Sequence, residues 1–359
     1  MRRRRRERAV WGMVPLLGPV VLGAAILWGC TGCGEGRGSG RLPGPIQVVG
    51  ESGTGPGQFF YPRSVAVDPQ GGFCVVDRSG RIQRFAADGT FLLSFELPAF
   101  QAGQPTGINF ARSGELLVAD SHYNRVLVYG APETPGGPPR IVRSFGSEGA
   151  GDGQFSLVRD IVEDSKGFLY VGDYDGPEDR IEKFTAEGRF LQAWGRRGTG
   201  PGEFQRPQGL CIERRRDGAE YLLAADSCNH RIQRFTLDGS FVDAFGSLGS
   251  GPGELKYPYA LAAFPPEAPG APAILVAEWG NNRIQCLDPA GRPLAVWGGP
   301  GRETGELSTP WDVALGPDGR IFVADFGNHR IQIFKPHSTV RPDSTFRPDS
   351  TVRPERAGG

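Results

Sequence analysis

Short apolar runs alternate with turn residues along most of the chain. The runs are about four to six residues long, rich in Val, Ile, Leu and Phe, and bounded by Gly, Pro, Asp or Asn. Because branched and aromatic side chains favour strands and the flanking residues favour tight turns, this pattern predicts strand–turn–strand units. Asp88-Gly89, Asp238-Gly239 and Asp318-Gly319 mark such turns. The pattern therefore predicts an all-β protein.

The predicted strands fall into repeats of about 50 residues. Each complete repeat opens on a GxGPGxF-like run and contains four apolar runs; the second repeat is degenerate. The first apolar run occurs six times, at Val65–Asp68, Gly107–Phe110, Asp160–Glu163, Gly209–Ile212, Ala260–Ala263 and Asp312–Leu315. Four strands per repeat are typical of a propeller blade. The sequence thus predicts one six-bladed β-propeller over residues 45–334.

The last repeat lacks a fourth strand, and its match lies at the other end of the chain. Pro45–Gly53 resembles Phe241–Gly249, which holds the fourth strand of an inner repeat. We expect this N-terminal strand to complete blade six and close the ring, with Ile46 and Val48 buried. Closure would remove an exposed strand edge, which is a liability in open sheets.

The N-terminal segment differs from the repeats. Residues 2–8 are strongly basic, and an uncharged apolar run follows from Ala9 to Trp28, so residues 1–30 are typical of an export signal. The sequence ending at Cys30 resembles a bacterial lipoprotein cleavage box, which makes Cys30 the predicted lipidation site. The alternative is an uncleaved membrane anchor, because the run is long enough to span a bilayer. Either reading predicts a bacterial cell envelope protein whose propeller lies outside the cytoplasm.

Two further segments are predicted to be unfolded. Residues 31–44 are Gly-rich and indicate a flexible tether. Residues 335–359 carry a six-residue repeat with too little apolar surface to fold alone, which indicates a disordered low-complexity tail.

Charge and cysteine content narrow the possible functions. The chain has 40 basic and 40 acidic side chains, and residues 2–8 hold six arginines and one glutamate, so the remainder has a net charge of −5. A mildly acidic protein argues against a nucleic-acid partner. Cys74, Cys211 and Cys286 fall in strands of different repeats, and Cys228 lies on a turn. We therefore expect buried free cysteines and no disulfide framework.

One motif carries a family resemblance. Asp325–Phe334 reads DFGNHRIQIF, and Cys228–Phe235 repeats most of it. Together with the GxGPGxF runs, this resembles the NHL (Asn-His-Leu) repeat family over residues 45–334. The resemblance implies a six-bladed propeller. It leaves the function open, because similar propellers include RNA-binding modules of ubiquitin ligases, extracellular sensor domains of bacterial kinases and a zinc-dependent amidating lyase.

Charged positions that recur in every repeat indicate scaffold. An acid ends the second run and an arginine begins the third; the acids are Asp77, Asp120, Asp173, Asp226, Glu278 and Asp325, and the arginines are Arg81, Arg125, Arg180, Arg231, Arg283 and Arg330. The two face each other across one turn, so we predict a structural ion pair in each blade. His230 and His329 belong to the same repeated phrase and receive the same interpretation.

The sequence offers no convincing catalytic set. The chain has four histidines, and His122 occupies a different column from His230 and His329, so the three do not form a converging zinc site. Asp160 and Asp312 are the only acids at the start of a first run; they could hold calcium, as lactonase-type propellers hold a cation at the channel mouth, but a repeat role is simpler. There is no GxSxG element. We predict no catalytic residue, metal or cofactor; the alternative is a metal-dependent propeller lyase or lactonase-type hydrolase.

One face varies between repeats and is the predicted binding surface. The residue after the proline of each first run should lie at the channel mouth, next to the turn between the second and third runs. The predicted ligand-binding residues are Arg63, Arg159, Gln208, Tyr259 and Trp311, with Tyr174, Trp279 and Phe326 from the turns. Such side chains suit a protein, peptide or glycan ligand, although they could instead pack on one another as a rim. The sequence thus favours a non-enzymatic binding scaffold.

Overall fold

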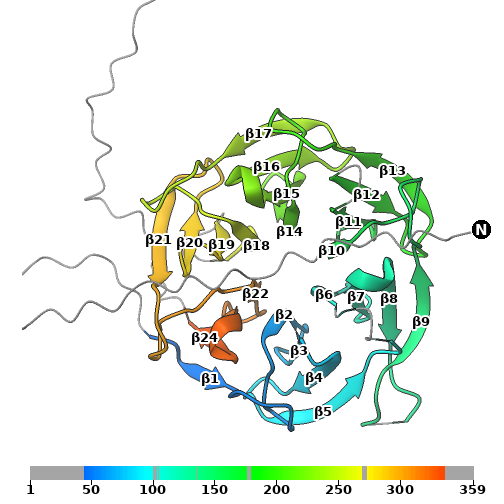
Figure 1. Ribbon diagram of the computed structural model, residues 1–359, viewed down its shortest axis with the longest axis vertical. Helices are drawn as coiled ribbons and strands as arrows, with labels where there is room; N and C mark the ends of the chain where they lie inside the picture. Colours follow the sequence, from blue (N-terminus) through cyan, green and yellow to red (C-terminus); the bar gives the residue numbers. More distant parts are fainter. Residues whose placement is uncertain are drawn as a thin grey trace, which may run out of the picture. The chain divides into compact units, whose positions relative to one another are not determined.

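The protein is a ring of six four-stranded sheets (Figure 1). The computed structural model describes residues 44–99, 103, 105–134, 136–175, 179–268 and 273–335. Within this part of the chain, each sheet is antiparallel and its strands run from the centre of the ring outwards in chain order, except in blade six. The predicted all-β six-bladed propeller is confirmed.

The strands occupy four concentric positions in the blades. The innermost strands are β2 (Pro62–Val67), β6 (Gly107–Phe110), β10 (Val158–Glu163), β14 (Pro207–Arg214), β18 (Pro258–Ala263) and β22 (Asp312–Leu315). The second strands are β3 (Phe73–Asp77), β7 (Leu116–Asp120), β11 (Leu169–Asp173), β15 (Glu220–Asp226), β19 (Ile274–Glu278) and β23 (Ile321–Asp325). The third strands are β4 (Arg81–Phe85), β8 (Arg125–Gly130), β12 (Arg180–Phe184), β16 (Arg231–Thr236), β20 (Arg283–Leu287) and β24 (Arg330–Phe334).

The outermost strands are β1 (Gln47–Val49), β5 (Phe91–Glu96), β9 (Arg140–Phe145), β13 (Phe190–Trp194), β17 (Phe241–Phe245) and β21 (Pro293–Gly298). Three single-turn 3₁₀ helices, η1 (Ser121–Tyr123), η2 (Ser227–Asn229) and η3 (Phe326–Asn328), connect the second strand to the third in blades two, four and six.

The hydrophobic core is divided into layers between neighbouring blades. Phe73 of blade one packs in one cluster with Phe322 of blade six, with ring centroids 5.2 Å apart. Val76 of blade one packs in another cluster with Val118 of blade two. Second strands such as β3 and β7 are buried along their whole length because a neighbouring blade covers each face. Cys74, Cys211 and Cys286 are buried and free, as predicted.

The N-terminal strand closes the ring, as predicted. β1 pairs antiparallel with β24, and Val49 lies opposite Ile331. The predicted burial was wrong by one residue. Ile46 and Val48 are 55% and 40% exposed, whereas Val49 is 7% exposed and joins the core between blades one and six. Side chains alternate between the two faces of a strand, so a shift of one position exchanges the buried and exposed sets.

Each second strand ends in a buried carboxylate that pairs with the arginine opening the third strand. All six predicted pairs are formed, with N···O distances from 2.6 Å in Glu278–Arg283 to 3.7 Å in Asp173–Arg180. The six acidic residues are at most 1% exposed. A carboxylate this deeply buried is stable only when its oxygens accept further hydrogen bonds.

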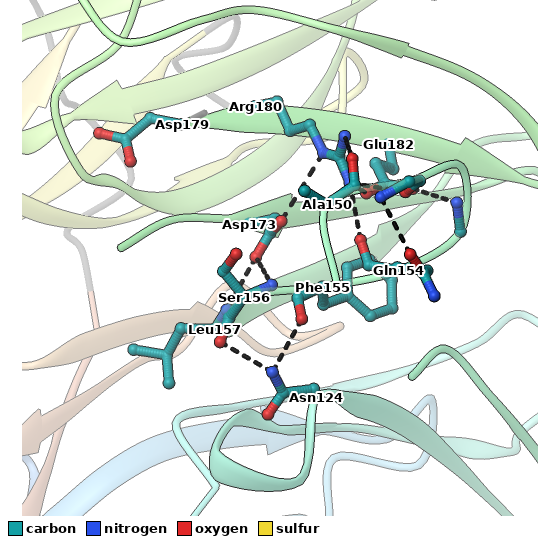
Figure 2. Close-up of polar contacts among 12 residues, drawn as sticks. Asn124, Ala150, Gln154, Phe155, Ser156, Leu157, Asp173, Asp179, Arg180 and Glu182 are labelled. Carbon is teal, nitrogen blue, oxygen red and sulfur yellow. Dashed lines mark hydrogen bonds and ion pairs between the residues drawn. The ribbon is translucent and has the colours of Figure 1, made fainter. Parts of the chain in front are cut away.

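Figure 2 shows these hydrogen bonds in blade three. Asp173 accepts hydrogen bonds from the backbone N–H groups of Ser156 and Leu157, both at 2.8 Å. Arg180 donates to the backbone carbonyl of Gln154 at 2.7 Å. The ion pair therefore holds the Gly-rich loop before β10 against the turn between β11 and β12. We call this arrangement of acid, arginine and loop the blade clamp.

A polar residue two positions after the arginine completes most clamps. In four blades it is a glutamine whose oxygen accepts from a loop glycine and whose nitrogen donates to a loop carbonyl: Gln83, Gln233, Gln285 and Gln332. Blade three has Glu182, whose Oε2 accepts from the Gly153 N–H at 3.0 Å and whose Oε1 lies 2.6 Å from Nη2 of Arg180. Burial raises the pKa of Glu182 to about 7, despite the attraction of Arg180.

A second set of polar contacts joins each blade to the next. His230 and His329 precede third strands with left-handed φ angles of 56° and 57°. Nδ1 of His230 accepts a hydrogen bond from the Tyr257 N–H at 3.1 Å, and Nδ1 of His329 accepts one from the Tyr61 N–H at 3.2 Å. Asn124 makes the equivalent contact between blades two and three by donating a hydrogen bond to the backbone carbonyl of Phe155 (Figure 2). Both histidines are therefore scaffold residues, as predicted.

The predictions for the two ends of the chain remain predictions. The signal or anchor, Cys30, most of the tether and most of the tail lie outside the described residues. Among the residues that the structure does describe, no helix is long and apolar enough to cross a membrane.

The closing strand should depend on Val49 rather than on its exposed neighbours. We expect Val49→Ala to lower the free energy of unfolding by about 2 kcal/mol, because it opens a cavity in the core between blades one and six. Val48→Ala, the matched control on the exposed face, should cost about 0.5 kcal/mol or less. Urea denaturation measures both; equal losses would contradict the pairing of β1 that buries Val49.

Replacing Glu182 by glutamine should stabilise the protein at neutral pH. The native state of the parent holds the Glu182 proton more tightly than the unfolded chain does. The stability that this group contributes is therefore complete below about pH 4.5 and is lost as the pH rises through about 7. We expect Glu182→Gln to raise the free energy of unfolding by about 1 to 3 kcal/mol near pH 8, and by less near pH 5.

Urea denaturation at both pH values tests this expectation. The matched control is Gln233→Glu in blade four, which should become less stable than the parent as the pH rises. If Glu182→Gln and the parent have the same free energy of unfolding at both pH values, the carboxyl group of Glu182 does not destabilise the clamp at neutral pH.

Candidate ligand-binding face at the channel mouth

Bulges in the innermost strands present the predicted site residues. The register between the first two strands shifts in blades one, three, four and five. The residues inside these shifts include Arg63, Arg159, Gln208 and Tyr259. A bulge leaves its extra residue outside the ladder and redirects its side chain. The remaining residues of the innermost strands line a central cavity of about 310 Å³, and we call the bulged end of these strands the channel mouth.

Arg159 joins the blades across the channel mouth. It is 3% exposed; its Nε lies 2.5 Å from Oε1 of Gln208 and its Nη1 donates to the Thr106 carbonyl at 2.8 Å. Its Cζ lies 5.9 Å from the ring centroid of Tyr259 and 5.7 Å from that of Trp311. Because β10 and β22 face each other across the ring (Figure 1), the side chain extends from blade three toward the opposite blade.

An aromatic cluster borders this arginine. Trp311 stacks on Phe326 with centroids 4.5 Å apart and meets Tyr259 edge-on at 5.1 Å. Tyr259 stacks in turn on Trp279 at 5.8 Å. These contacts connect blades five and six through the four aromatic residues predicted from the sequence. Tyr61, 4.9 Å from Phe326, extends the cluster to blade one.

Tyr61 was missing from the predicted set. It directly precedes Pro62, whereas the predicted residues of the innermost strands are those that follow such a proline. Including both neighbours of each proline would have found it. Arg63 also borders the cluster, with its Cζ 5.5 Å from the Trp311 ring.

The predicted face is more deeply packed than expected. Gln208 and Arg159 are 2% and 3% exposed, and Tyr174 is 8% exposed. Tyr174 packs against Arg206, whose Cζ lies 5.2 Å from its ring. The alternative of a mutually packed rim is therefore realised in part, and the remaining members are half-buried.

Three arginines at the channel mouth lie close enough to influence one another. Burial lowers the pKa of Arg63 to about 10, and the neighbouring charges of Arg78 and Arg159 act in the same direction. Burial also raises the pKa of Tyr259, which keeps its hydroxyl neutral. Guanidinium groups and aromatic faces together can receive an anionic or π-bearing ligand.

Asp160 and Asp312, the candidate cation ligands, tie neighbouring innermost strands together. Asp160 accepts a hydrogen bond from the Leu210 N–H of blade four at 2.9 Å, and Asp312 accepts one from the Val65 N–H of blade one at 2.9 Å. Burial raises their pKa values to about 7 and about 6, and the charge of Asp312 adds to the effect on Asp160. In the described part of the chain, no group of three or more His, Cys, Asp or Glu residues could hold a metal ion.

The sequence comparisons identify the repeat. The family model for the NHL repeat matches residues 307–334, which contain the three inner strands of blade six. The chain is 24% identical over 304 residues to mouse NHL repeat-containing protein 3, a match that covers 76% of this chain and 78% of that protein. This chain is a six-bladed β-propeller that contains an NHL repeat.

Other relatives share a shorter segment with this NHL propeller. RING finger protein nhl-1 of Caenorhabditis elegans is 36% identical over 81 residues, covering 23% of this chain and 8% of the relative. The E3 ubiquitin-protein ligase TRIM71 of Xenopus tropicalis is 44% identical over 55 residues, covering 15% and 7%. The match thus spans less than a tenth of these two relatives.

Solved structures share the architecture at low identity. A protein assigned as a gluconolactonase superposes with a TM-score of 0.55 and 16% identity, covering 80% of this chain and 92% of that one. A streptogramin B lyase superposes with a TM-score of 0.50 and 15% identity, covering 77% and 93%. Identities this low show the shared fold alone.

Metal analysis tests whether Asp160 and Asp312 bind a cation. We expect the purified NHL propeller to carry no stoichiometric metal, and added calcium to leave its melting temperature unchanged, because backbone N–H groups already occupy these carboxylates. Asp312→Asn should lower the melting temperature with or without calcium. One equivalent of bound calcium or zinc that disappears in Asp160→Asn would overturn this expectation and favour the enzyme alternative.

Proposed function

We propose that this NHL propeller is a non-enzymatic binding protein that holds a peptide segment of a partner protein at its channel mouth. The observation that carries the proposal is the aromatic cluster around Trp311. Scaffold positions repeat from blade to blade, whereas the cluster is built from positions that do not repeat. Half-buried aromatic side chains beside arginines are the composition of binding hot spots.

The position of the cluster supports the same function. Tyr259 lies on a bulge and Trp311 directly precedes β22, while Trp279 and Phe326 directly follow second strands. The sheet sets the backbone geometry at these positions and leaves the side chains free to differ. Among the relatives, TRIM71 is a ubiquitin ligase, an enzyme that acts on proteins. A protein or peptide partner is therefore favoured over a glycan. Anchoring through Cys30 at a bacterial envelope belongs to the same proposal and rests on the N-terminal sequence alone.

A metal-dependent lyase or lactonase-type hydrolase is the second candidate. It is motivated by the shared fold with the gluconolactonase and the streptogramin B lyase. Its chemistry would require a cation in the channel, where Asp160 and Asp312 are engaged with backbone N–H groups. The metal content of the purified protein separates the two candidates.

Selection from a displayed random peptide library tests the proposed function. We expect the full-length chain to enrich peptides that Trp311→Ala and Tyr259→Ala bind about thirtyfold more weakly, since truncating a central aromatic residue removes about 2 kcal/mol or more. Fluorescence anisotropy of the labelled peptides gives the dissociation constants.

Phe241→Ala is the matched control, because Phe241 is an aromatic residue on the outermost strand of blade four and is 38% exposed. It should bind the selected peptides as the parent does. Peptides that bind the parent, Trp311→Ala and Tyr259→Ala equally well would place the binding site elsewhere on the propeller.

A further inference from the structure

Two buried donors at the channel mouth lack acceptors. Oε1 of Gln208 accepts a hydrogen bond from Nε of Arg159. The amide nitrogen of Gln208 is therefore the group that remains as a donor. Neither Nε2 of Gln208 nor Nε1 of Trp311 has a hydrogen-bond partner among the residues that the structure describes, and both atoms are shielded from solvent. An unpaired buried donor is unfavourable, so the two together point to an acceptor supplied from outside.

Arg159 adds a buried positive charge beside these donors. Its contacts are a carbonyl oxygen, an amide oxygen and two aromatic faces, and it forms no ion pair with an acidic side chain of the described residues. Asp160 and Asp312 lie near enough to feel its charge, but their oxygens accept backbone N–H groups. A buried cation without a direct anionic partner is unfavourable.

Arg159 connects the side chains that carry these two donors. Arg159 contacts both Gln208 and Trp311, so the two unpaired N–H groups belong to side chains that border the same guanidinium group. The three side chains come from blades three, four and six, and each occupies the start of an innermost strand. Tyr259 and Trp279 provide an apolar wall next to them.

We propose that the channel mouth is a carboxylate-binding site, in which Arg159, Gln208 and Trp311 receive an acidic side chain of the bound peptide. The proposal rests on the proposed function for the identity of the partner. A carboxylate fits because it is planar, carries two acceptor oxygens and neutralises one guanidinium. The aromatic wall packs against the aliphatic part of the acidic residue or its neighbours.

Gln208→Glu is the decisive variant. It places a carboxylate on the side chain that already accepts a hydrogen bond from Arg159, and it removes the unpaired amide donor. The new carboxylate then takes the place of the peptide carboxylate. We expect its melting temperature to equal or exceed that of the parent, and its affinity for the selected peptides to fall at least about thirtyfold. Trp311→Phe keeps an aromatic ring but removes the Nε1 donor, and should weaken binding by about fivefold to tenfold.

Asn109→Asp is the matched control for charge. Asn109 lines the central cavity from the innermost strand of blade two, so this variant adds the same negative charge to the channel. It should bind the peptides as the parent does. The peptides themselves are compared with versions in which Asp and Glu become Asn and Gln, and with versions that have an amidated C-terminus. These two series distinguish a side-chain carboxylate from a terminal one.

A small probe tests the carboxylate site without a peptide partner. N-acetylglutamate N-methylamide at millimolar concentration should quench tryptophan fluorescence of the parent and not of Gln208→Glu, whereas the glutamine analogue should quench neither. If the probe binds but no library peptide does, the carboxylate site stands and the peptide-binding function fails. If peptides bind the parent and Gln208→Glu equally, or if the amide analogues bind as well as the acids, the carboxylate site is wrong.

Discussion

The blade clamp is the interaction on which the rest of the structure depends. In every blade a carboxylate at the end of the second strand is buried and paired with the arginine that opens the third strand. In the five blades that keep the Gly-rich loop, the pair also binds that loop, which leads directly into the innermost strand. A buried ion pair is costly when unsupported, so the loop's backbone groups make this device favourable. The clamp thereby fixes where each innermost strand begins.

This scaffold sets the geometry of the channel mouth. Four of the six innermost strands begin with a bulge, and bulged residues point away from the ladder without disturbing the blade core. Their identity is therefore free to vary while the clamps and the contacts between blades stay constant. Arg159 and Trp311 meet because blades three and six are opposite each other in a ring of six.

The same geometry favours the proposed binding role over the metal-dependent alternative. A cation would need free oxygen ligands, whereas Asp160 and Asp312 each use one oxygen to accept from the backbone of the following blade and the other to accept from their own strand. At the channel mouth, N–H donors of Gln208 and Trp311 have no acceptor among the described residues. Unpaired donors beside a guanidinium select anionic oxygen, not a metal ion.

The sequence by itself determined the six blades, the acid–arginine pairs and the closing strand, because each is written as a local pattern that recurs at a fixed spacing. It also named four of the five aromatic residues in the cluster at the channel mouth, all but Tyr61, because they break that pattern. It did not determine which face of β1 is buried, since one residue of register exchanges Val48 for Val49. Only the tertiary structure decided that Arg159 crosses to Trp311, that Tyr174 packs apart with Arg206, and that Gln208 keeps an unpaired donor. These depend on distances between blades that are far apart in sequence, and no local pattern encodes them.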